Sequence, residues 1–455
     1  MKPLQMPMFS PETEWIPPTH LPDLKDHKEI AIDLETRDPG LKSSGSGSVN
    51  GNGEVVGIAV AVEGWSGYFP IAHEGGGNMD RALVLDWFEE VLHTDATKIF
   101  HNAMYDVSWI RSMGFYIRGG VIDTLIAASL IDENRWGYAL NALGKQYVGV
   151  GKNEKILNDA AKSWGIDPKA DMWRLPAPLV GEYAEQDAVL TLRLWHALQR
   201  EISSQDLWDV FNLETNLFPC LIDMKFKGVR VDAEKANLLK QELIKEEKNI
   251  YRGIRKLIGF DVEIWAAASI AKAFDEVKLP YDRTEKGAPS FTKNFLSTHP
   301  HELPKAIANA REINKAHTTF IDTIIKHEHN GRIHADINQI RSDDGGTVTG
   351  RFSYSNPNLQ QIPARNKDLG PKIRALFIPE KNHTWGCFDY SQQEPRIVVH
   401  FASLLKLEGS QTIVDQYNAG EADFHQMIAD MAGIERKQAK TINLGLMYGM
   451  GKNKL

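Results

Sequence analysis

Two carboxylates near the start of the chain stand two residues apart inside an apolar segment. Residues 28–36, Lys-Glu-Ile-Ala-Ile-Asp-Leu-Glu-Thr, have the composition of a buried β-strand, so Asp33 and Glu35 project from the same face. Two adjacent acids in apolar surroundings are costly unless a cation or another partner neutralises them. This spacing therefore predicts a site that binds a positively charged group.

Two later segments place an acid four residues after another polar side chain. Asn102 and Asp106 follow a short strand-like segment and lie at the expected start of a helix. Tyr183 and Asp187 lie in residues 181–195, whose apolar residues recur with helical periodicity, so the phenol and the carboxylate share one face. Taken singly, each pair has a simpler explanation, because helix acids are usually solvated and a tyrosine often only packs.

These acids have a common chemical explanation when they are considered together. Four carboxylates can hold two divalent ions about 4 Å apart, one activating water and the other stabilising a leaving 3′ oxygen. A tyrosine hydroxyl can orient the attacking water. The predicted set consists of four metal ligands and one positioning hydroxyl: Asp33, Glu35, Asp106, Asp187 and Tyr183.

A second arrangement of acids lies in residues 385–396, Trp-Gly-Cys-Phe-Asp-Tyr-Ser-Gln-Gln-Glu-Pro-Arg. Its apolar start, residues 385–388, predicts a strand that ends at Asp389, and Pro395 has the fixed φ of a first helical turn. A strand end holds a carboxylate oxygen still, which suits a metal ligand that bridges to phosphate. A lone Asp in this position would more often be a cap or turn residue. Glu394 lies five residues further on.

Four residues near the end of the chain are spaced by four and form a slowly turning stripe on one expected helix: Arg436, Lys440, Leu444 and Tyr448. The two cations, one turn apart, suit the β- and γ-phosphates of a nucleotide. A solvated basic face is the alternative, and the apolar remainder of the segment weakens it.

These motifs resemble those of the family A DNA polymerases, the bacterial polymerase I group and its phage relatives. Asp-Tyr-Ser-Gln-x-Glu-x-Arg, beginning at Asp389, is similar to the first catalytic motif of that family, and residues 436–449 are similar to its fingers helix. The four acids and Tyr183 resemble its proofreading 3′→5′ exonuclease domain, in the variant with tyrosine. The resemblance extends over nearly the whole chain from about residue 28.

The resemblance implies roles for individual residues. In the polymerase it implies metal binding by Asp389 and exclusion of a ribose 2′-hydroxyl by Glu394. It implies nucleotide binding by Arg365, Glu394, Arg436, Lys440, Leu444 and Tyr448, and DNA contacts by Asn102, Arg311, Lys315, Arg351, Asn358 and Gln361. An ordinary loop over the palm is the alternative for Asn358 and Gln361. The family usually has Phe or Tyr where this chain has Leu444, which leaves its sugar discrimination open.

Composition limits the classes of protein without choosing among them. The 455 residues, 42% hydrophobic and 25% charged, are typical of a soluble protein of two to four domains. Two cysteines, Cys220 and Cys387, form no disulfide framework, and we expect a cytoplasmic chain with no membrane partner. A net charge of −8 neither indicates nor excludes nucleic-acid binding, because local basic patches can bind DNA.

The expected fold class is α/β and α+β multidomain. The resemblance implies a ribonuclease H-like exonuclease domain followed by an incomplete right-hand polymerase domain with a thumb, a partial palm and partial fingers. The expected divisions are an N-terminal extension (1–27), the exonuclease domain (28–204), the polymerase entry and thumb (205–330), the partial palm (331–410) and the partial fingers (411–455). The Gly/Ser/Asn-rich residues 40–54 are expected to form a flexible hairpin loop inside the first domain.

The last palm motif of the family, His-Asp-Glu, supplies a second metal ligand, and this triplet does not occur in the sequence. The resemblance implies two Mg²⁺ ions per active site, with Mn²⁺ as a substitute, and primer–template DNA, single-stranded 3′ ends and dNTPs as partners. We expect replicative polymerisation to need a second polypeptide that carries the missing palm segment. The alternatives are a truncated product, or a stand-alone exonuclease or DNA-binding module with a non-functional palm. No 5′ nuclease segment precedes the exonuclease, which favours a phage type acting in an infected or bacterial cell.

Overall fold

The computed structural model describes residues 11–343, 345–364 and 366–451. The chain divides into two compact units, Met1–Ile378 and Pro379–Leu455, and each is described by itself. No helix in the described ranges combines the length and the hydropathy that a lipid bilayer requires.

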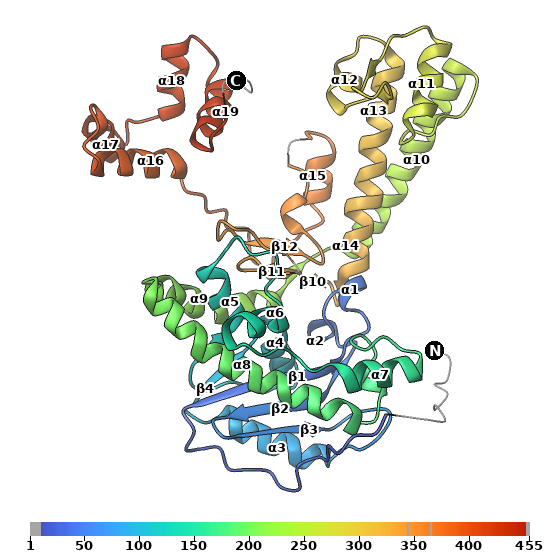
Figure 1. Cartoon of the computed structure of the whole chain (residues 1–455). Coiled ribbons are helices and arrows are strands. Elements are labelled where there is room, and N and C mark those ends of the chain that lie inside the picture. The colour runs from blue at the N-terminus through green and yellow to red at the C-terminus, as the bar shows by residue number, and fades with distance from the viewer. Residues whose placement is uncertain (1–10, 344, 365, 452–455) are drawn as a thin grey trace. The chain divides into compact units, whose positions relative to one another are not determined.

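The first unit is built around a five-stranded mixed sheet (Figure 1). In spatial order its strands are β3 (Trp65–Pro70), β2 (Glu54–Val62), β1 (Glu29–Arg37), β4 (Thr97–Phe100) and β5 (Val121–Asp123). The pairs β1–β2 and β2–β3 are antiparallel, whereas β1–β4 and β4–β5 are parallel. The predicted strand over residues 28–36 is confirmed, and β1 is the central strand of the sheet.

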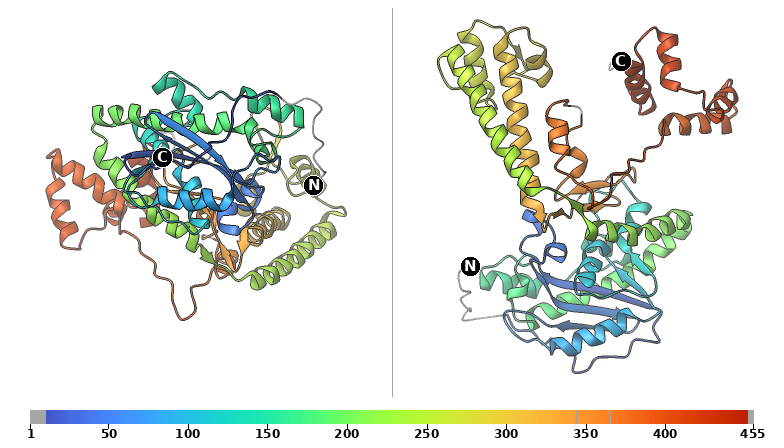
Figure 2. Two further views of the ribbon diagram at one scale, coloured as in Figure 1. Left: turned by 90° about the horizontal axis from the view of Figure 1, so that it is seen from below. Right: turned by 180° about the vertical axis from the view of Figure 1, so that it is seen from behind.

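Helices cover both faces of this sheet, and Figure 2 shows it from below with α3 lying against it. One core contains α3 (Arg81–Leu92) and α4 (Ala103–Ser112), and the other contains α5 (Thr124–Ile131) and α8 (Pro178–Ser204). Ile30, Ile32 and Leu34 pack in the first core and Ala31 in the second. Because side chains alternate along a strand, Asp33 and Glu35 belong to the face that α5 and α8 cover.

Shorter elements connect these layers. The expected loop over residues 40–54 does lie between two strands of one sheet, but it contains two short helices, α1 (Leu41–Ser44) and α2 (Gly47–Asn50). Between α5 and α8 lie α6 (Leu140–Leu143), the π-helix η1 (Gly144–Val148), α7 (Lys155–Trp164) and the 3₁₀-helix η2 (Met172–Arg174).

The rest of the first unit is dominated by two long helices, α10 (Ala233–Ile258) and α13 (Glu302–Lys315), which run side by side (Figures 1 and 2). The other elements are α9 (Trp208–Lys227), β6 (Val229–Arg230), α11 (Ala267–Glu276), β7 (Asp282–Arg283), β8 (Pro289–Ser290), α12 (Lys293–Thr298), η3 (Ala316–Ile321), α14 (Asp322–His327), β9 (Glu328–His329), β10 (Arg332–Ile333), β11 (Asp336–Asn338), β12 (Ser353–Ser355), η4 (Leu359–Gln361) and α15 (Leu369–Arg374). The strand-like alternation over residues 332–339 thus becomes two short strands, β10 and β11.

The second unit consists of helices: α16 (Gln393–Leu404), α17 (Ser410–Asn418), α18 (Phe424–Ala432) and α19 (Arg436–Met447). The prediction of a strand over residues 385–388 was wrong, because these residues are exposed and non-helical but form no strand. A strand needs a neighbouring strand to satisfy its backbone N–H and C=O groups. The described residues of this unit contain no strand that could serve as that neighbour.

Candidate active site

Strand β1 and helix α8 bring three carboxylates together. A ligand oxygen from each of Asp33, Glu35 and Asp187 lies within 4.8 Å of the others. In the part of the chain that the structure describes, this is the one set of three His, Cys, Asp or Glu residues with such spacing. The register of β1 with β2 shifts between Glu35 and Thr36, so the strand becomes irregular immediately after its second acid.

Helix α8 can lie close to the sheet because small residues face it. Ala184 and Ala188 are fully buried in the core that α8 shares with β1 and β2. Tyr183 and Asp187 flank these alanines, one turn apart, and both are buried. The Asp187 Oδ1 atom is inaccessible and has no hydrogen-bond partner among the described residues. A buried, unpaired carboxylate oxygen is rare and fits a ligand atom for a cation.

Lys152 reaches into this acidic group, and the sequence analysis missed it. Its Nζ donates to Asp187 Oδ2 and, at 3.3 Å, to the Tyr183 hydroxyl, and it lies 5.1 Å from the centre of the Tyr183 ring. The backbone beside it is held to α8, because Gln186 Nε2 donates to Gly151 O and Asn153 N donates to Gln186 Oε1. A lysine in a Gly-rich loop gives no sequence signal for such a position.

The fourth expected ligand lies beside the cluster instead of within it. Asp106, in the first turn of α4, accepts a hydrogen bond at 3.0 Å from Leu34 N, the amide between the two β1 acids. Asn102 precedes α4 with a left-handed φ of 68°, and its backbone N–H donates to Asp123 Oδ1. Asp123 also caps Ala103 N and Leu125 N, so one buried carboxylate fixes the starts of both α4 and α5.

Burial and mutual repulsion make these acids hard to ionise without a cation. Burial raises the pKa of Asp33 to about 7, assisted by Asp187 and opposed by Lys152. Burial, with Asp33 adding to it, also holds the pKa of Glu35 and of Asp106 well above the usual range. Burial alone would lower the pKa of Lys152, but the surrounding acids outweigh it and raise the pKa. A positive ion therefore fits this donor set.

An aromatic residue fills the space beside Glu35. Gly57 on β2 pairs with Glu35, and a Cβ atom at Gly57 would lie 2.0 Å from the Tyr68 hydroxyl oxygen. The same hydroxyl lies 2.6 Å from His73 Nε2, while His73 Nδ1 lies 3.0 Å from Leu175 O. Because a carbonyl only accepts, Nδ1 carries the proton and Nε2 accepts from Tyr68. Burial lowers the pKa of His73 to about 4, so this histidine is neutral.

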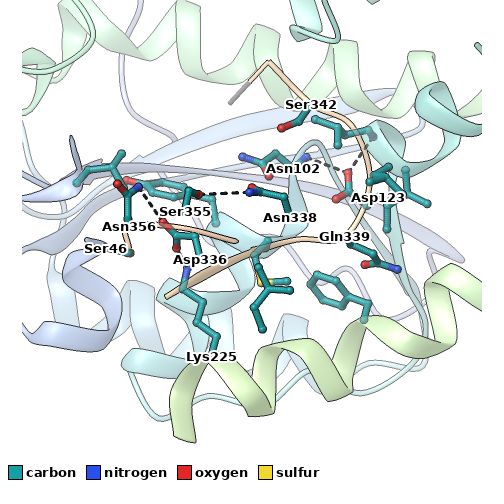
Figure 3. Close-up of a pocket in the computed structure, with 18 of the residues that line it drawn as sticks. Ser46, Asn102, Asp123, Lys225, Asp336, Asn338, Gln339, Ser342, Ser355 and Asn356 are labelled. Carbon is teal, nitrogen blue, oxygen red and sulfur yellow. Dashed lines mark hydrogen bonds and ion pairs between the residues drawn. The ribbon is translucent and has the colours of Figure 1, made fainter. Parts of the chain in front are cut away.

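Two cavities that share lining residues lie in this region, and one of them contains the clustered acids. The smaller, about 290 Å³, is lined by the three clustered carboxylates, Tyr183 and Lys152. The larger, about 510 Å³, lies against β11 and β12 and is shown in Figure 3. Its labelled polar residues include Ser46, Asn338 and Asn356. The two cavities have Asn102, Leu125 and Ser342 in common.

The expected DNA contacts outside this site have varied surroundings. Arg311 is half-buried and donates to the carbonyls of Ile264 and Phe291, so it ties the α13 helix to neighbouring segments. Lys315 is exposed, and with Gln361 it lines a cavity of about 410 Å³.

Two of the remaining expected contacts, Arg351 and Asn358, are exposed, and Asn358 caps η4 through Gln360 N. Arg365 lies outside the described residues.

The second unit carries most of the expected nucleotide-binding residues on or beside helices α16 and α19. Asp389 is exposed, and Glu394 lies in the first turn of α16. Arg436 begins α19 and pairs with Asp423 at 2.8 Å. Lys440 is exposed, Leu444 is half-buried and Tyr448 follows the last turn. No set of three metal-binding side chains includes Asp389 among the described residues.

Comparison with known proteins identifies two families along the chain. Residues 19–203 match the 3′-5′ exonuclease model and residues 233–455 match DNA polymerase family A. The chain is 38% identical to a DNA-directed DNA polymerase of Pseudomonas phage M6, covering 99% of this chain and 72% of that protein. It is 31% identical to the DNA polymerase DpoZ of Salmonella phage PMBT28, covering 95% and 71% respectively.

More distant relatives agree with this assignment. DNA polymerase I of Pseudomonas aeruginosa is 30% identical, and the match covers 94% of this chain and 47% of that enzyme. The POL domain of Pol1 from M. smegmatis, solved with DNA primer-template and dNTP, has the same fold with a TM-score of 0.70 at 21% identity. That match covers 93% of this chain and 69% of the other.

The class is therefore that of a DNA-directed DNA polymerase, a nucleotidyltransferase, which also carries a 3′-5′ exonuclease domain. The chain belongs to DNA polymerase family A, and its relatives include phage enzymes.

Proposed function

We propose that Asp33, Glu35 and Asp187 form the active site of a 3′→5′ exonuclease that removes nucleotides from single-stranded DNA ends. Two observations carry this proposal: ligand oxygens of the three acids lie within 4.8 Å of one another, and Asp187 Oδ1 is buried without a hydrogen-bond partner among the described residues. Such a donor set suits divalent ions, and we propose two Mg²⁺ ions, replaceable by Mn²⁺. When bound, the ions supply activation of the attacking water and stabilisation of the leaving 3′ oxygen.

The protein side chains divide the remaining work. Asp33, Glu35 and Asp187 hold the cations, with Asp106 as the outer acid beside them. The Tyr183 hydroxyl orients the water, because it lies one helical turn from Asp187 and lines the same cavity. The terminal nucleotide occupies the 290 Å³ cavity, and the preceding nucleotide extends past Asn102 into the larger one.

We propose that the polymerase half binds primer–template DNA and dNTPs. Residues 205–330 would form the entry and thumb, 331–410 the palm and 411–455 part of the fingers, after an exonuclease domain at 28–204. Asp389 would bind metal, Glu394 would exclude ribose, and Arg436, Lys440, Leu444 and Tyr448 would hold the nucleotide. To do so, Arg436 must exchange Asp423 for a phosphate, whose oxygens accept the same kind of charge-assisted hydrogen bonds from a guanidinium.

The proposed DNA contacts of this half are Lys315, Arg351, Asn358 and Gln361. Arg311 is not among them, because its guanidinium donates to two backbone carbonyls. Asp389 needs a second carboxylate to complete a two-metal site. We propose that the polymerase half acts in DNA replication in the cytoplasm of a bacterial cell. Primer extension in Mg²⁺ by the wild type and by Asp389→Ala tests the role of Asp389, and equal extension by the two proteins contradicts it.

The exonuclease proposal is tested with the double variant Asp33→Ala, Glu35→Ala. We expect it to release no mononucleotides from 3′-labelled single-stranded DNA in Mg²⁺, because two of the three acids that hold the cations are gone. Glu63→Ala is the matched control, since Glu63 is exposed in the turn after β2. Digestion by the double variant at the wild-type rate would refute the assignment.

A further inference from the structure

Lys152 is the one cation placed directly on a proposed metal ligand among the described residues of the site. Its side chain is 14% exposed and that of Asp187 is 3% exposed. The ammonium bridges Asp187 Oδ2 and the Tyr183 hydroxyl, which are the two groups that α8 contributes to the proposed chemistry. None of the roles proposed above uses this lysine.

The position of Lys152 creates a competition for one carboxylate. A divalent ion held by Asp33, Glu35 and Asp187 would neutralise the same negative charge that the Lys152 ammonium neutralises in this structure. The Asp187 Oδ1 atom is buried and has no hydrogen-bond partner among the described residues, while Oδ2 accepts from the ammonium. Two positive charges in one buried cluster repel each other, so entry of the ion weakens the lysine contact.

The backbone around Lys152 is anchored, whereas its side chain is long. Lys152 N donates to Asn141 Oδ1 at 3.0 Å, and Gln186 bonds both neighbouring residues, Gly151 and Asn153. The main chain is thus held against α8, and the four-carbon stem can swing the ammonium out of the cluster and back.

We infer that Lys152 is a built-in counter-ion, which neutralises the acids when the cluster holds no divalent ion and yields Asp187 when one binds. In the first state it stabilises the closely spaced acids. In the second state the ion neutralises the acids in its place. This inference rests on the proposed function, because it requires Asp187 to be a metal ligand.

The test compares Lys152→Met with the matched control Lys155→Met in the full chain. Lys155 is exposed at the start of α7 and contacts no acid of the cluster among the described residues. Mn²⁺ binding is measured by calorimetry after treatment with EDTA, and the thermal midpoint is measured in EDTA and in Mn²⁺. We expect Lys152→Met to bind Mn²⁺ roughly five- to tenfold more tightly, because the competing internal cation is gone.

In EDTA the midpoint of Lys152→Met should fall by several degrees, and Mn²⁺ should restore most of that loss. Lys152→Arg has the opposite expectation. Its planar fork grips a carboxylate with two hydrogen bonds, so it should keep the midpoint in EDTA and bind Mn²⁺ more weakly. This second variant keeps the test decisive even if the methionine variant does not fold.

Unchanged or weaker Mn²⁺ binding by Lys152→Met overturns the counter-ion role, as does unchanged binding by Lys152→Arg. Failure of the proposed function has a different signature. In that case the wild type and the Asp33→Ala, Glu35→Ala variant show the same Mn²⁺ binding, or neither binds Mn²⁺. The inference then fails together with the proposed function. If Mn²⁺ binding is lost in the Asp33→Ala, Glu35→Ala variant but unchanged in the Lys152 variants, only the counter-ion role is refuted and the proposed function stands.

Discussion

Lys225 and Asp336 form an ion pair with Nζ 3.0 Å from Oδ1, in which the lysine side chain is 3% exposed and the aspartate side chain 21%. The pair joins the end of α9 to β11 and lines the 510 Å³ cavity. Asn356 Nδ2 donates to the other carboxylate oxygen, so Asp336 is held from two sides. Each charge depends on its partner, because a buried charge without one is costly.

Replacing one member of this pair should therefore destabilise the first unit. We expect Lys225→Met to lower the free energy of unfolding by about 3 kcal/mol, since Asp336 keeps its charge without a counter-ion. Urea denaturation followed by tryptophan fluorescence measures the change. Lys227→Met, two residues along and exposed, is the control, and Lys225→Met, Asp336→Asn should recover part of the loss. A single variant as stable as the control contradicts the expectation.

Tyr183 offers a test that separates catalysis from metal binding. Tyr183→Phe keeps the ring but removes the hydroxyl proposed to orient water, so we expect roughly a hundredfold slower digestion of single-stranded DNA. Mn²⁺ affinity should stay close to that of the wild type, because the acids are untouched. Quench-flow digestion under single-turnover conditions measures the rate. A loss of affinity that parallels the loss of rate would instead make Tyr183 part of the ion site.

His73 gives a prediction for the pH dependence of stability. Its pKa is lowered by burial from 6.5 to about 4, so the unfolded chain takes up a proton before the folded chain does. The stability that His73 contributes is fully present above pH 6.5 and is lost as the pH falls through about 4. Between these values its share of the slope is at most about 1.4 kcal/mol per pH unit.

The measurement for His73 compares unfolding free energies of the wild type and His73→Gln between pH 7.5 and about pH 4.5. The variant should have the shallower decline, because glutamine takes up no proton in this range. Parallel curves for the two proteins would show that His73 is not responsible.

Glu394 tests the polymerase half. Glu394→Ala should raise the incorporation of ribonucleotides relative to deoxynucleotides, because a methyl group leaves room for a 2′-hydroxyl. The ratio is measured by primer extension with matched ribonucleotides and deoxynucleotides, in a preparation that extends primers. Glu408→Ala, at an exposed acid after α16, is the control. An unaltered ratio counts against the steric role.

The elements around β1 were predictable because local patterns determine them. Asp33 and Glu35 alternate with fully apolar residues, and only a strand puts both on one face, so their convergence followed from the period of the strand. The helical spacing of Tyr183 and Asp187 likewise gave their common face. The packing of the Asp187 face of α8 against the Glu35 face of β1 was expected only from the family resemblance. No local sequence pattern determines which layers pack together.

Other features could not be found in this way. Lys152 lies in a loop whose position depends on hydrogen bonds to Asn141 and Gln186, and such tertiary contacts leave no periodic trace. Asp106 has helical spacing from Asn102, but its side chain turns to the Leu34 amide, which the spacing does not encode. The apolar run at residues 385–388 has the composition of a strand, yet strands require pairing partners that composition alone cannot supply.

The pairing of Gly57 with Glu35 has a consequence for tolerated variation. Any side chain at position 57 would collide with the Tyr68 phenol, whose hydroxyl oxygen and two nearest ring carbons lie 2.0–2.4 Å from the place of a new Cβ. Relief would require displacing the phenol, and with it the contact to His73 and the strand that carries Glu35. In a saturation mutagenesis library selected for nuclease activity, Gly57 should therefore be as invariant as the acids, although it has no side chain that could take part in the reaction.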